Sequence, residues 1–415
     1  MADEKRVKKK QKLNISALVK VTGSALLIVL LILAAAFVIG EKTGEKSAFS
    51  ENGFEIGAAS VKELKPYNGG VAAVADSAVY YFDGSGNLLS KNEHTYSAPV
   101  ACVNGKNLLL YDLGGNNLRI EKRGGIYSEH SFKSVITCGA MGKRGNYAYA
   151  LNSDGGFQSH LFVFSDRDKK IFEWGSSSDY ISCLSLSDNG KLCAASILTS
   201  ENARIVSVVK LFDFSAEEPL FSVEFQDSVI YDIAVVSSKQ LIVFCDNGVY
   251  SVAADGAKTE LLSYSSTEIT HYYDYPSGLK AVSVAVFGNE RNTKLTVFSR
   301  RGKILFEKSF NGEITALSCS KNRIGVAFRD RIESYDSRGN SVGLLETEEA
   351  CTEAIISGGR LYVLGANGLH SFSINSRTSS KTENNTTVEN KTSSENETAS
   401  EINESEATTV LNEVG

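Results

Sequence analysis

Proline and tryptophan are scarce in this chain, which has four prolines and a single tryptophan, Trp174, among 415 residues. Helical spacing of apolar residues is missing from every long segment after residue 40. Short alternating runs of Val, Ile, Tyr, Phe, Ser and Thr take its place, and such runs are typical of β-strands. The motifs HExxH, G-x-S-x-G and Walker A are also missing. These absences disfavour a helical fold and the enzyme classes that those motifs define.

Cysteine is present, but none of the seven cysteines belongs to a CxxC pair. A zinc ribbon or a thioredoxin-like centre is therefore disfavoured. Three cysteines, Cys102, Cys138 and Cys183, take equivalent places in the repeats described below. We interpret them as small buried residues, and a metal cluster is the alternative interpretation.

Charge of one sign gathers only at the two ends of the chain. Residues 1–20 carry seven Lys and Arg against Asp3 and Glu4, a net charge of +5. Residues 378–415 carry eight Glu against two Lys, a net charge of −6. The long middle of the chain is close to balanced and has no basic stripe, so no nucleic-acid partner is expected.

One segment is long and apolar enough to cross a membrane. Residues 21–40, VTGSALLIVLLILAAAFVIG, contain no charged side chain, and twenty helical residues span roughly 30 Å, the thickness of a bilayer core. The basic arm 1–20 precedes this span, so the positive-inside rule predicts a cytoplasmic N-terminus, with the linker 41–51 and all later residues outside. A signal peptide cleaved near residues 34–36 is the alternative, although its apolar run would be unusually long.

Three stretches share one form: AVYYFDGSGNLLSKN (78–92), LTVFSRRGKILFEKSF (295–310) and IESYDSRGNSVGLLE (332–346). Each has a strand, then Asp or Ser, a short polar stretch with Gly, and a second strand. This pattern predicts a hairpin whose Gly supplies the positive φ that the turn requires. The segment DGSGN (83–87) also begins like a calcium loop, but the hairpin explains it fully.

The hairpins belong to a four-strand unit that recurs about every 40 residues. Units begin near residues 60, 98, 134, 179, 228, 268, 313 and 350. Four antiparallel strands at this period are typical of a β-propeller, whose blades stack in a ring because one blade cannot bury both of its faces. The last unit, 351–375, has three strands, and strand 52–58 would supply the fourth. The sequence thus predicts an all-β propeller over 52–375 with eight blades, seven blades being the alternative.

Two of these patterns carry a resemblance to known proteins. ISCLSLSDNGKLCAAS (181–196) resembles the first half of a WD40 blade, and the F-x-x-x-G-x-x-L hairpins resemble quinoprotein-type blades. With its basic N-terminus, single span and external propeller, the chain resembles a family of Gram-positive bacterial membrane proteins known only as a domain of unknown function. The resemblance covers most of the chain and implies a fold and a location, but no catalytic residue. The WD dipeptide and the His-Asp network of true WD40 blades are missing.

One position of the innermost strand is equivalent in all eight units. Its occupants, in order, are Glu63, Cys102, Cys138, Cys183, Asp232, His271, Ala316 and Glu353. Asp232 and His271 belong to neighbouring units, and Glu353 would adjoin Glu63 in a ring of eight. Carboxylates with an imidazole can bind a metal ion or a small polar ligand. We therefore predict a channel-mouth site at Asp232, His271, Glu63 and Glu353; the alternative is that each satisfies a local backbone group.

These observations favour a non-catalytic module, a membrane-anchored propeller outside the cell that binds a protein or a cell-wall component. The tail 376–415, made mostly of Ser, Thr, Asn and Glu, is expected to be a disordered acidic spacer. A ligand sensor that signals through the span is the alternative, although the short cytoplasmic arm would need a partner. An enzyme is least favoured, and no cofactor is expected.

Overall fold

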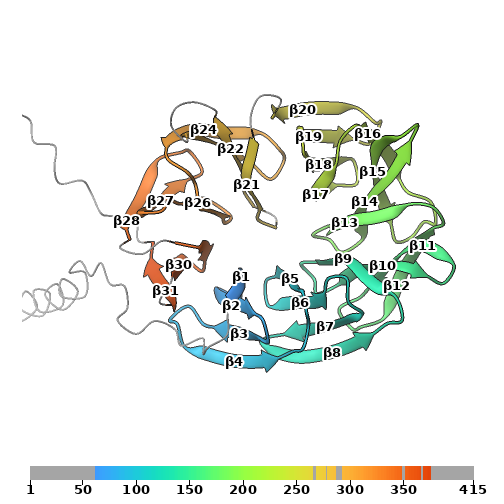
Figure 1. The fold of residues 1–415 in the computed structure, drawn as a ribbon, viewed down its shortest axis with the longest axis horizontal. Coiled ribbons are helices and arrows are strands. Elements are labelled where there is room, and N and C mark those ends of the chain that lie inside the picture. Colours follow the sequence, from blue (N-terminus) through green and yellow to red (C-terminus); the bar gives the residue numbers. More distant parts are fainter. Residues whose placement is uncertain are drawn as a thin grey trace, which may run out of the picture. The chain divides into compact units, whose positions relative to one another are not determined.

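The computed structural model describes residues 61–264, 268–276, 278–286, 292–347, 351–365 and 368–374. These residues form eight antiparallel sheets, each built from strands that are consecutive in the sequence. Seven sheets have four described strands and the last has three. The sheets are arranged as blades around a common centre, and the chain runs once around the ring (Figure 1). The prediction of an eight-bladed β-propeller is confirmed, and the seven-blade alternative is wrong.

Each blade runs from its innermost strand to its outermost strand in sequence order. Blade 1 contains β1 (Val61–Tyr67), β2 (Gly70–Ala75), β3 (Ala78–Phe82) and β4 (Leu88–Glu93). Blade 2 contains β5 (Pro99–Asn104), β6 (Asn107–Asp112), β7 (Asn117–Lys122) and β8 (Gly125–Ser131). Blade 3 contains β9 (Val135–Met141), β10 (Tyr147–Asp154), β11 (Phe157–Phe164) and β12 (Lys170–Ser176). Blade 4 contains β13 (Tyr180–Leu186), β14 (Leu192–Glu201), β15 (Arg204–Asp213) and β16 (Phe221–Gln226).

The last four blades follow the same order. Blade 5 contains β17 (Ile230–Ser237), β18 (Gln240–Cys245), β19 (Gly248–Ala253) and β20 (Lys258–Ser263). Blade 6 contains β21 (Glu268–Asp274), β22 (Lys280–Val286), β23 (Asn292–Phe298) and β24 (Ile304–Asn311). Blade 7 contains β25 (Ala316–Cys319), β26 (Arg323–Ala327), β27 (Arg331–Asp336) and β28 (Ser341–Glu346). Blade 8 contains β29 (Glu353–Ser357), β30 (Arg360–Gly365) and β31 (Gly368–Ser373).

The hairpins between third and fourth strands have the predicted turn chemistry. The Asp336 carboxylate accepts hydrogen bonds from the backbone N–H groups two and four residues later, at 2.8 and 3.0 Å. Gly339 follows with a φ of +84°, a region that residues with a Cβ disfavour. Asp83 and Gly86 of blade 1 repeat this arrangement. In blade 3 the glycine position is taken by Asp168 with a φ of +63°, which aspartate tolerates better than most residues.

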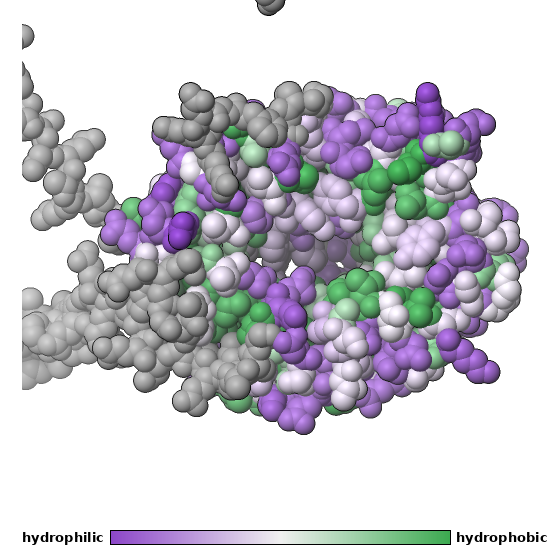
Figure 2. Space-filling model, in the orientation of Figure 1, coloured by the Kyte–Doolittle hydropathy of each residue, from purple (hydrophilic) through white to green (hydrophobic). Residues whose placement is uncertain are grey.

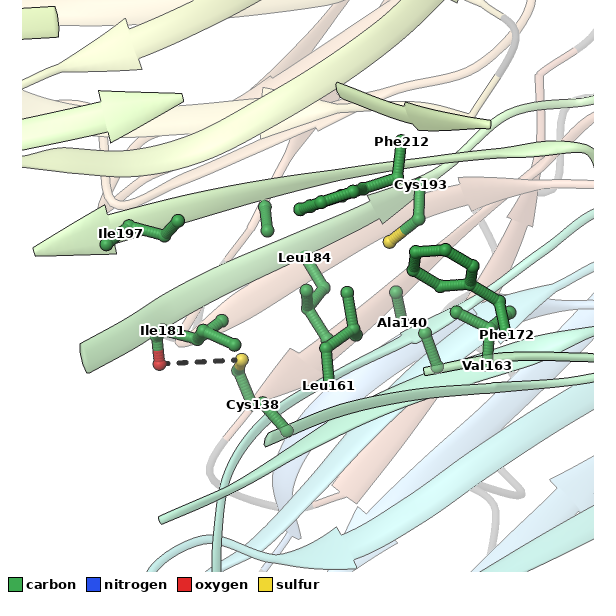
Figure 3. Packing of buried hydrophobic residues seen from close by; sticks show 13 residues of the cluster. Cys138, Ala140, Leu161, Val163, Phe172, Ile181, Leu184, Cys193, Ile197 and Phe212 are labelled. Atoms are coloured by element: carbon green, nitrogen blue, oxygen red, sulfur yellow. Dashed lines mark hydrogen bonds between the residues drawn. The ribbon is translucent and has the colours of Figure 1, made fainter. Parts of the chain in front are cut away.

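The hydrophobic core lies between neighbouring blades. Figure 3 shows blades 3 and 4, where Leu161 and Phe172 face Ile181 and Phe212 in one buried cluster. Burying one such side chain stabilises the fold by about 1.5–3 kcal/mol. Because the two faces of a blade pack against different neighbours, the ring as a whole buries what a single blade would expose.

Buried serines link successive blades by hydrogen bonds to the next innermost strand. Ser159 Oγ of blade 3 accepts a hydrogen bond from the Ile181 N–H of blade 4 at 3.1 Å. Ser207 of blade 4 does the same for Ile230 of blade 5 at 3.3 Å. These bonds satisfy backbone donors that would otherwise be buried without a partner at the seam between two sheets.

The last blade closes directly on the first. Ile355 and Tyr362 of blade 8 pack with Leu64 and Val71 of blade 1 in one buried cluster. The backbone N–H of Leu64 also donates a hydrogen bond to the Glu353 carboxylate at 2.7 Å. The ring is therefore joined by side-chain packing and by a hydrogen bond to the Glu353 carboxyl group at its seam.

Several predicted segments lie outside the described residues, namely the arm 1–20, the span 21–40, the linker 41–51, the closing strand 52–58 and the tail 376–415. Among the residues that are described, no helix has the length and apolar character needed to cross a membrane. The predictions for these five segments stand as made from the sequence.

Connections between strands fall on two faces of the ring because successive strands run in opposite directions. We call one the N-terminal face, since β1 begins there at Val61. It carries the loops between blades and the turns between second and third strands. The opposite face, which we call the turn face, carries the turns that join the first strand to the second and the third to the fourth.

Candidate functional site: the central channel

The innermost strands of all eight blades surround a central channel. Its cavity measures about 660 Å³, a size typical of small-molecule sites. Figure 2 shows the hollow at the centre of the ring, with hydrophilic side chains among those at its rim. All four residues of the predicted site line this channel: Glu63, Asp232, His271 and Glu353.

A β-bulge precedes the predicted position in five of the innermost strands. The register with the second strand shifts by one residue just before each of Glu63, Cys138, Cys183, Asp232 and His271. A bulge increases the local twist and re-aims the side chains that follow it. These five residues are therefore structurally equivalent, as the spacing of the repeats predicts.

Glu63 and Glu353 are neighbours at the seam between blades 1 and 8, as expected for a ring of eight. Burial raises the pKa of Glu353 to about 7; the hydrogen bond from Leu64 opposes the rise and the charge of Glu63 adds to it. Glu63 forms an ion pair with Lys65, and these two side chains are 32% and 30% exposed, toward the channel. Burial lowers the pKa of Lys65, but the attraction of Glu63 outweighs this and raises it overall.

Asp232 lies on the opposite part of the channel wall, on blade 5. Its carboxylate accepts a hydrogen bond from the backbone N–H of Ile233 at 2.8 Å. Burial raises the pKa of Asp232 to about 7, and the negative charge of Asp274 on blade 6 adds to the rise. The positive charges of Lys280 and Lys65 lower the pKa of Asp232. Lys280 is itself ion-paired with Asp274.

His271 also lines the channel but has different neighbours from Asp232. Its Nδ1 atom is buried and has no hydrogen-bond partner among the described residues. Burial lowers the pKa of His271, while the backbone of Thr315 and the charge of Glu313 oppose this. The described part of the chain contains no group of three or more His, Cys, Asp or Glu side chains placed to share a metal ion. The structure thus brings only the two glutamates together, and metal binding stays a prediction.

All seven cysteines are free thiols. Cys138 is buried, whereas Cys102 and Cys183 are half-buried. Burial raises the pKa of Cys102 and of Cys138 to about 12. Because the thiolate is the form that attacks substrates, thiols with such pKa values are poor nucleophiles. The burial of Cys138 agrees with its interpretation as a small buried residue, whereas Cys102 and Cys183 are only half-buried.

Sequence reasoning missed three ion pairs that line the channel: Glu63–Lys65, Asp274–Lys280 and Asp188–Arg300. The first had a local signal, since residues two apart in a strand share one face. The second had another, since Asp274 and Lys280 lie opposite each other across a hairpin. The third had none, because Arg300 of blade 6 reaches Asp188 of blade 4, at 2.9 Å.

The fold and the channel define the class of this protein, an eight-bladed β-propeller with a charged central channel. The chain belongs to the family of unknown function DUF5711, whose sequence profile matches residues 45–400. The predicted resemblance to a family of unknown function is therefore confirmed. No curated protein matches the chain at a significant level.

Solved structures of low sequence identity have a similar fold. Sqt1 of Chaetomium thermophilum, bound to the N-terminus of the ribosomal protein L10, is 15% identical with a TM-score of 0.52, covering 77% of this chain and 98% of that one. Sqt1 of Saccharomyces cerevisiae is 9% identical with a TM-score of 0.51, covering 76% and 96%. BamB from Moraxella catarrhalis is 13% identical with a TM-score of 0.44, covering 74% and 95%. At these identities, the similarity to the two Sqt1 structures shows the fold alone.

Proposed function

We propose that this protein is a single-span membrane protein whose propeller lies outside the cytoplasm and binds a protein partner without catalysing a reaction. The span and its orientation rest on the apolar segment 21–40 and on the basic arm before it. The observation that carries protein binding is a set of exposed apolar residues on the N-terminal face of blades 2 to 4. Its five residues, which we call the apolar arc, are each between 39 and 50% exposed: Leu113, Val135, Phe157, Tyr180 and Ile205. Exposed apolar patches mark interaction sites on soluble domains.

Hydrogen bonds connect the turns that carry the apolar arc to the next blade. The turn that follows Leu113 exchanges backbone hydrogen bonds of 2.9 and 2.8 Å with the strand that begins at Val135. The strand that begins at Tyr180 donates a backbone N–H to Ser159, two residues after Phe157, at 3.1 Å. The last member of the arc lies on this same fourth blade. The five side chains thus lie on one face of three consecutive blades that are hydrogen-bonded to one another.

The charges near the apolar arc indicate the chemistry of the partner. Acidic residues outnumber basic ones in the turns and loops that adjoin the arc residues in the sequence. The acidic residues are Asp154, Asp179, Glu201 and Asp227, and the basic ones are Lys133 and Arg204. Protein interfaces combine an apolar centre with a polar rim of complementary charge. We therefore expect the partner to present apolar side chains among basic ones.

A peptide-binding role also fits the class of fold. Sqt1 of Chaetomium thermophilum, a propeller of similar fold, is bound to the N-terminus of a ribosomal protein. The absence of the common catalytic motifs from the sequence supports a non-catalytic role. A ligand sensor is the second candidate, and the charged channel favours it over an enzyme.

The proposed location is tested by labelling intact cells with a membrane-impermeant amine reagent. The Lys143 side chain is 57% exposed on the propeller, and we expect it to react before cell lysis. The lysines of residues 1–20 serve as the internal control, because a cytoplasmic arm reacts only after lysis. Labelling of Lys143 only after lysis would show that the propeller faces the cytoplasm.

Protein binding at the apolar arc is tested with a photo-crosslinking amino acid in the full-length protein, in the cells that produce it. Positions 135 and 205 lie in the arc, and matched control positions 88 and 304 carry Leu and Ile that are 51% and 38% exposed where outer strands begin on the turn face. We expect one protein to be cross-linked from the arc and not from the controls. Val135→Asp should abolish the cross-link from position 205. Identical products from all four positions would refute the role of the arc.

A further inference from the structure

We propose that the central channel binds an aliphatic diamine or polyamine, with one ammonium group at Asp232 and another at Glu353. The proposal goes beyond protein binding at the apolar arc and uses none of the arc residues. It concerns a ligand that enters the cavity of about 660 Å³ enclosed by the eight innermost strands.

The charge of the channel wall is unbalanced. Among the described residues that line the cavity, five carboxyl groups accompany three cationic side chains. Each cation has its own carboxylate, in the pairs Glu63–Lys65, Asp274–Lys280 and Asp188–Arg300. Asp232 and Glu353 remain, and within the described part of the chain their hydrogen bonds come from the backbone N–H groups of Ile233 and Leu64. These two carboxyl groups are therefore the ones on the channel wall that have no cationic side chain of their own.

The placement of the two remaining carboxyl groups favours an elongated dication over a metal ion. Asp232 lies on blade 5 and Glu353 on blade 8, with blades 6 and 7 between them. A metal ion needs several ligands around one point, and the described residues provide no such group of three. An aliphatic amine instead carries separate charges at the ends of a methylene spacer.

The remainder of the wall suits the spacer and the charges of such an amine. The apolar residues Val103 and Leu186 line the same cavity and can contact methylene groups. Tyr272 is 42% exposed and also lines the cavity. Its ring can attract an ammonium group near Asp232 by a cation–π interaction.

The surroundings of the two carboxyl groups predict that amine binding releases protons. The groups that act on Asp232 come from four other blades and from its own strand: Asp274, Lys280, Tyr272, Lys65, Cys102, Cys183 and Tyr231. Those that act on Glu353 are Glu63, Lys65, Tyr273 and Cys351. With a pKa of about 7, each of the two carboxyl groups is partly protonated at neutral pH. An adjacent ammonium group favours the charged carboxylate and expels the proton.

The test is isothermal titration calorimetry of the full-length protein in neutral detergent, with spermidine as the probe. Titrations at pH 7 in cacodylate and in HEPES, which differ in ionisation enthalpy, give the number of protons exchanged. We expect saturable binding with a net release of protons, because the ammonium groups favour the charged form of both carboxyl groups. Butylamine, with a single ammonium group, should bind at least tenfold more weakly.

Two isosteric variants assign the binding to the proposed residues. Asp232→Asn and Glu353→Gln should each weaken spermidine binding at least tenfold and reduce the proton release. Glu224→Gln, on the exposed face of the outer strand β16, is the matched control and should bind like the wild type. The proton release of the wild type tests the proposal independently if a variant fails to fold.

Three outcomes would overturn the proposal. They are the absence of spermidine binding, binding that neither variant weakens, and binding without proton release. Saturable binding of Ca²⁺ or Mn²⁺ in place of spermidine, lost in the two variants, would assign the channel to a metal ion instead. None of these results bears on cross-linking from the apolar arc, so this proposal and the proposed function fail separately.

Discussion

The carboxyl groups of Glu121 and Asp232 differ in how far hydrogen bonds and ion pairs offset the cost of removing a charge from water. Glu121 is fully buried and accepts hydrogen bonds from Arg119 at 2.6 Å, from the Tyr81 hydroxyl at 2.6 Å and from Asn92 at 2.5 Å. Asp232 in the channel has the backbone N–H of Ile233 and shares the lysines of its neighbours with other carboxylates. Asp232 is half-buried on the channel wall. A partly desolvated charge without its own partner destabilises the folded state, and protonation relieves part of that cost.

The pH dependence of stability follows from the raised pKa of Asp232. Its folded-state pKa of about 7 lies above the unfolded value of about 3.9, so the folded state binds more protons between these values. The free energy of unfolding contributed by this group therefore falls as the pH rises from about 4 to about 7. We expect Asp232→Asn to remove this pH-dependent loss of stability. Between pH 4.5 and pH 8, the free energy of unfolding of the variant should therefore rise by roughly 1 to 3 kcal/mol relative to that of the wild type.

Urea unfolding of the two proteins at both pH values, in amine-free buffer, measures this difference. Asp227→Asn is the control, because that side chain is 60% exposed on the N-terminal face and its ion pair with Arg204 contributes little. An equal effect of pH on the wild type and on Asp232→Asn would show that Asp232 is ionised throughout the range.

At the scale of strands and turns, the sequence contains most of the information on the fold. The predicted unit starts lie within three residues of the first strands of the blades, which begin at 61, 99, 135, 180, 230, 268, 316 and 353. The reason is that the turn chemistry is local. An Asp83 or Asp336 carboxylate bonds to its own turn, and a glycine supplies the positive φ within the same five residues. A repeat of local signals could therefore be counted without any tertiary contact.

The candidate site was predictable only in part, because it depends on contacts between elements. The period of two along a strand, together with the repeat, placed Glu63, Asp232, His271 and Glu353 on the channel wall. Which of these side chains lie close together depends on how the blades are arranged around the channel. Glu63 and Glu353 are neighbours. The pKa of Asp232, in contrast, is shifted by Asp274 and Lys280 rather than by His271, which takes the equivalent position in the next blade. No local pattern specifies such distances.

At the scale of the whole molecule, the seam between blades 8 and 1 distinguishes a closed ring from an open stack. Tyr362 is fully buried there against Leu64 and Val71. The two blades also approach closely through backbone on the turn face, where Gly358 of blade 8 lies against Gly69 of blade 1. In repeat proteins each interface contributes to stability separately, so a change confined to this seam should weaken closure while leaving each blade's own sheet intact.

Two adjacent glycines in the turn between β29 and β30 provide a matched test of the seam. Both have positive φ, +57° at Gly358 and +78° at Gly359, so an alanine at either position costs about 1 kcal/mol for the backbone conformation alone. A Cβ at position 358 would lie 2.0 Å from the Gly69 carbonyl oxygen, whereas a Cβ at position 359 meets no atom within 4 Å. We therefore expect Gly358→Ala to lower the melting temperature at least twice as much as Gly359→Ala, measured by circular dichroism. Equal shifts for the two variants would mean that blades 8 and 1 do not meet in this way, because only that contact distinguishes the two positions.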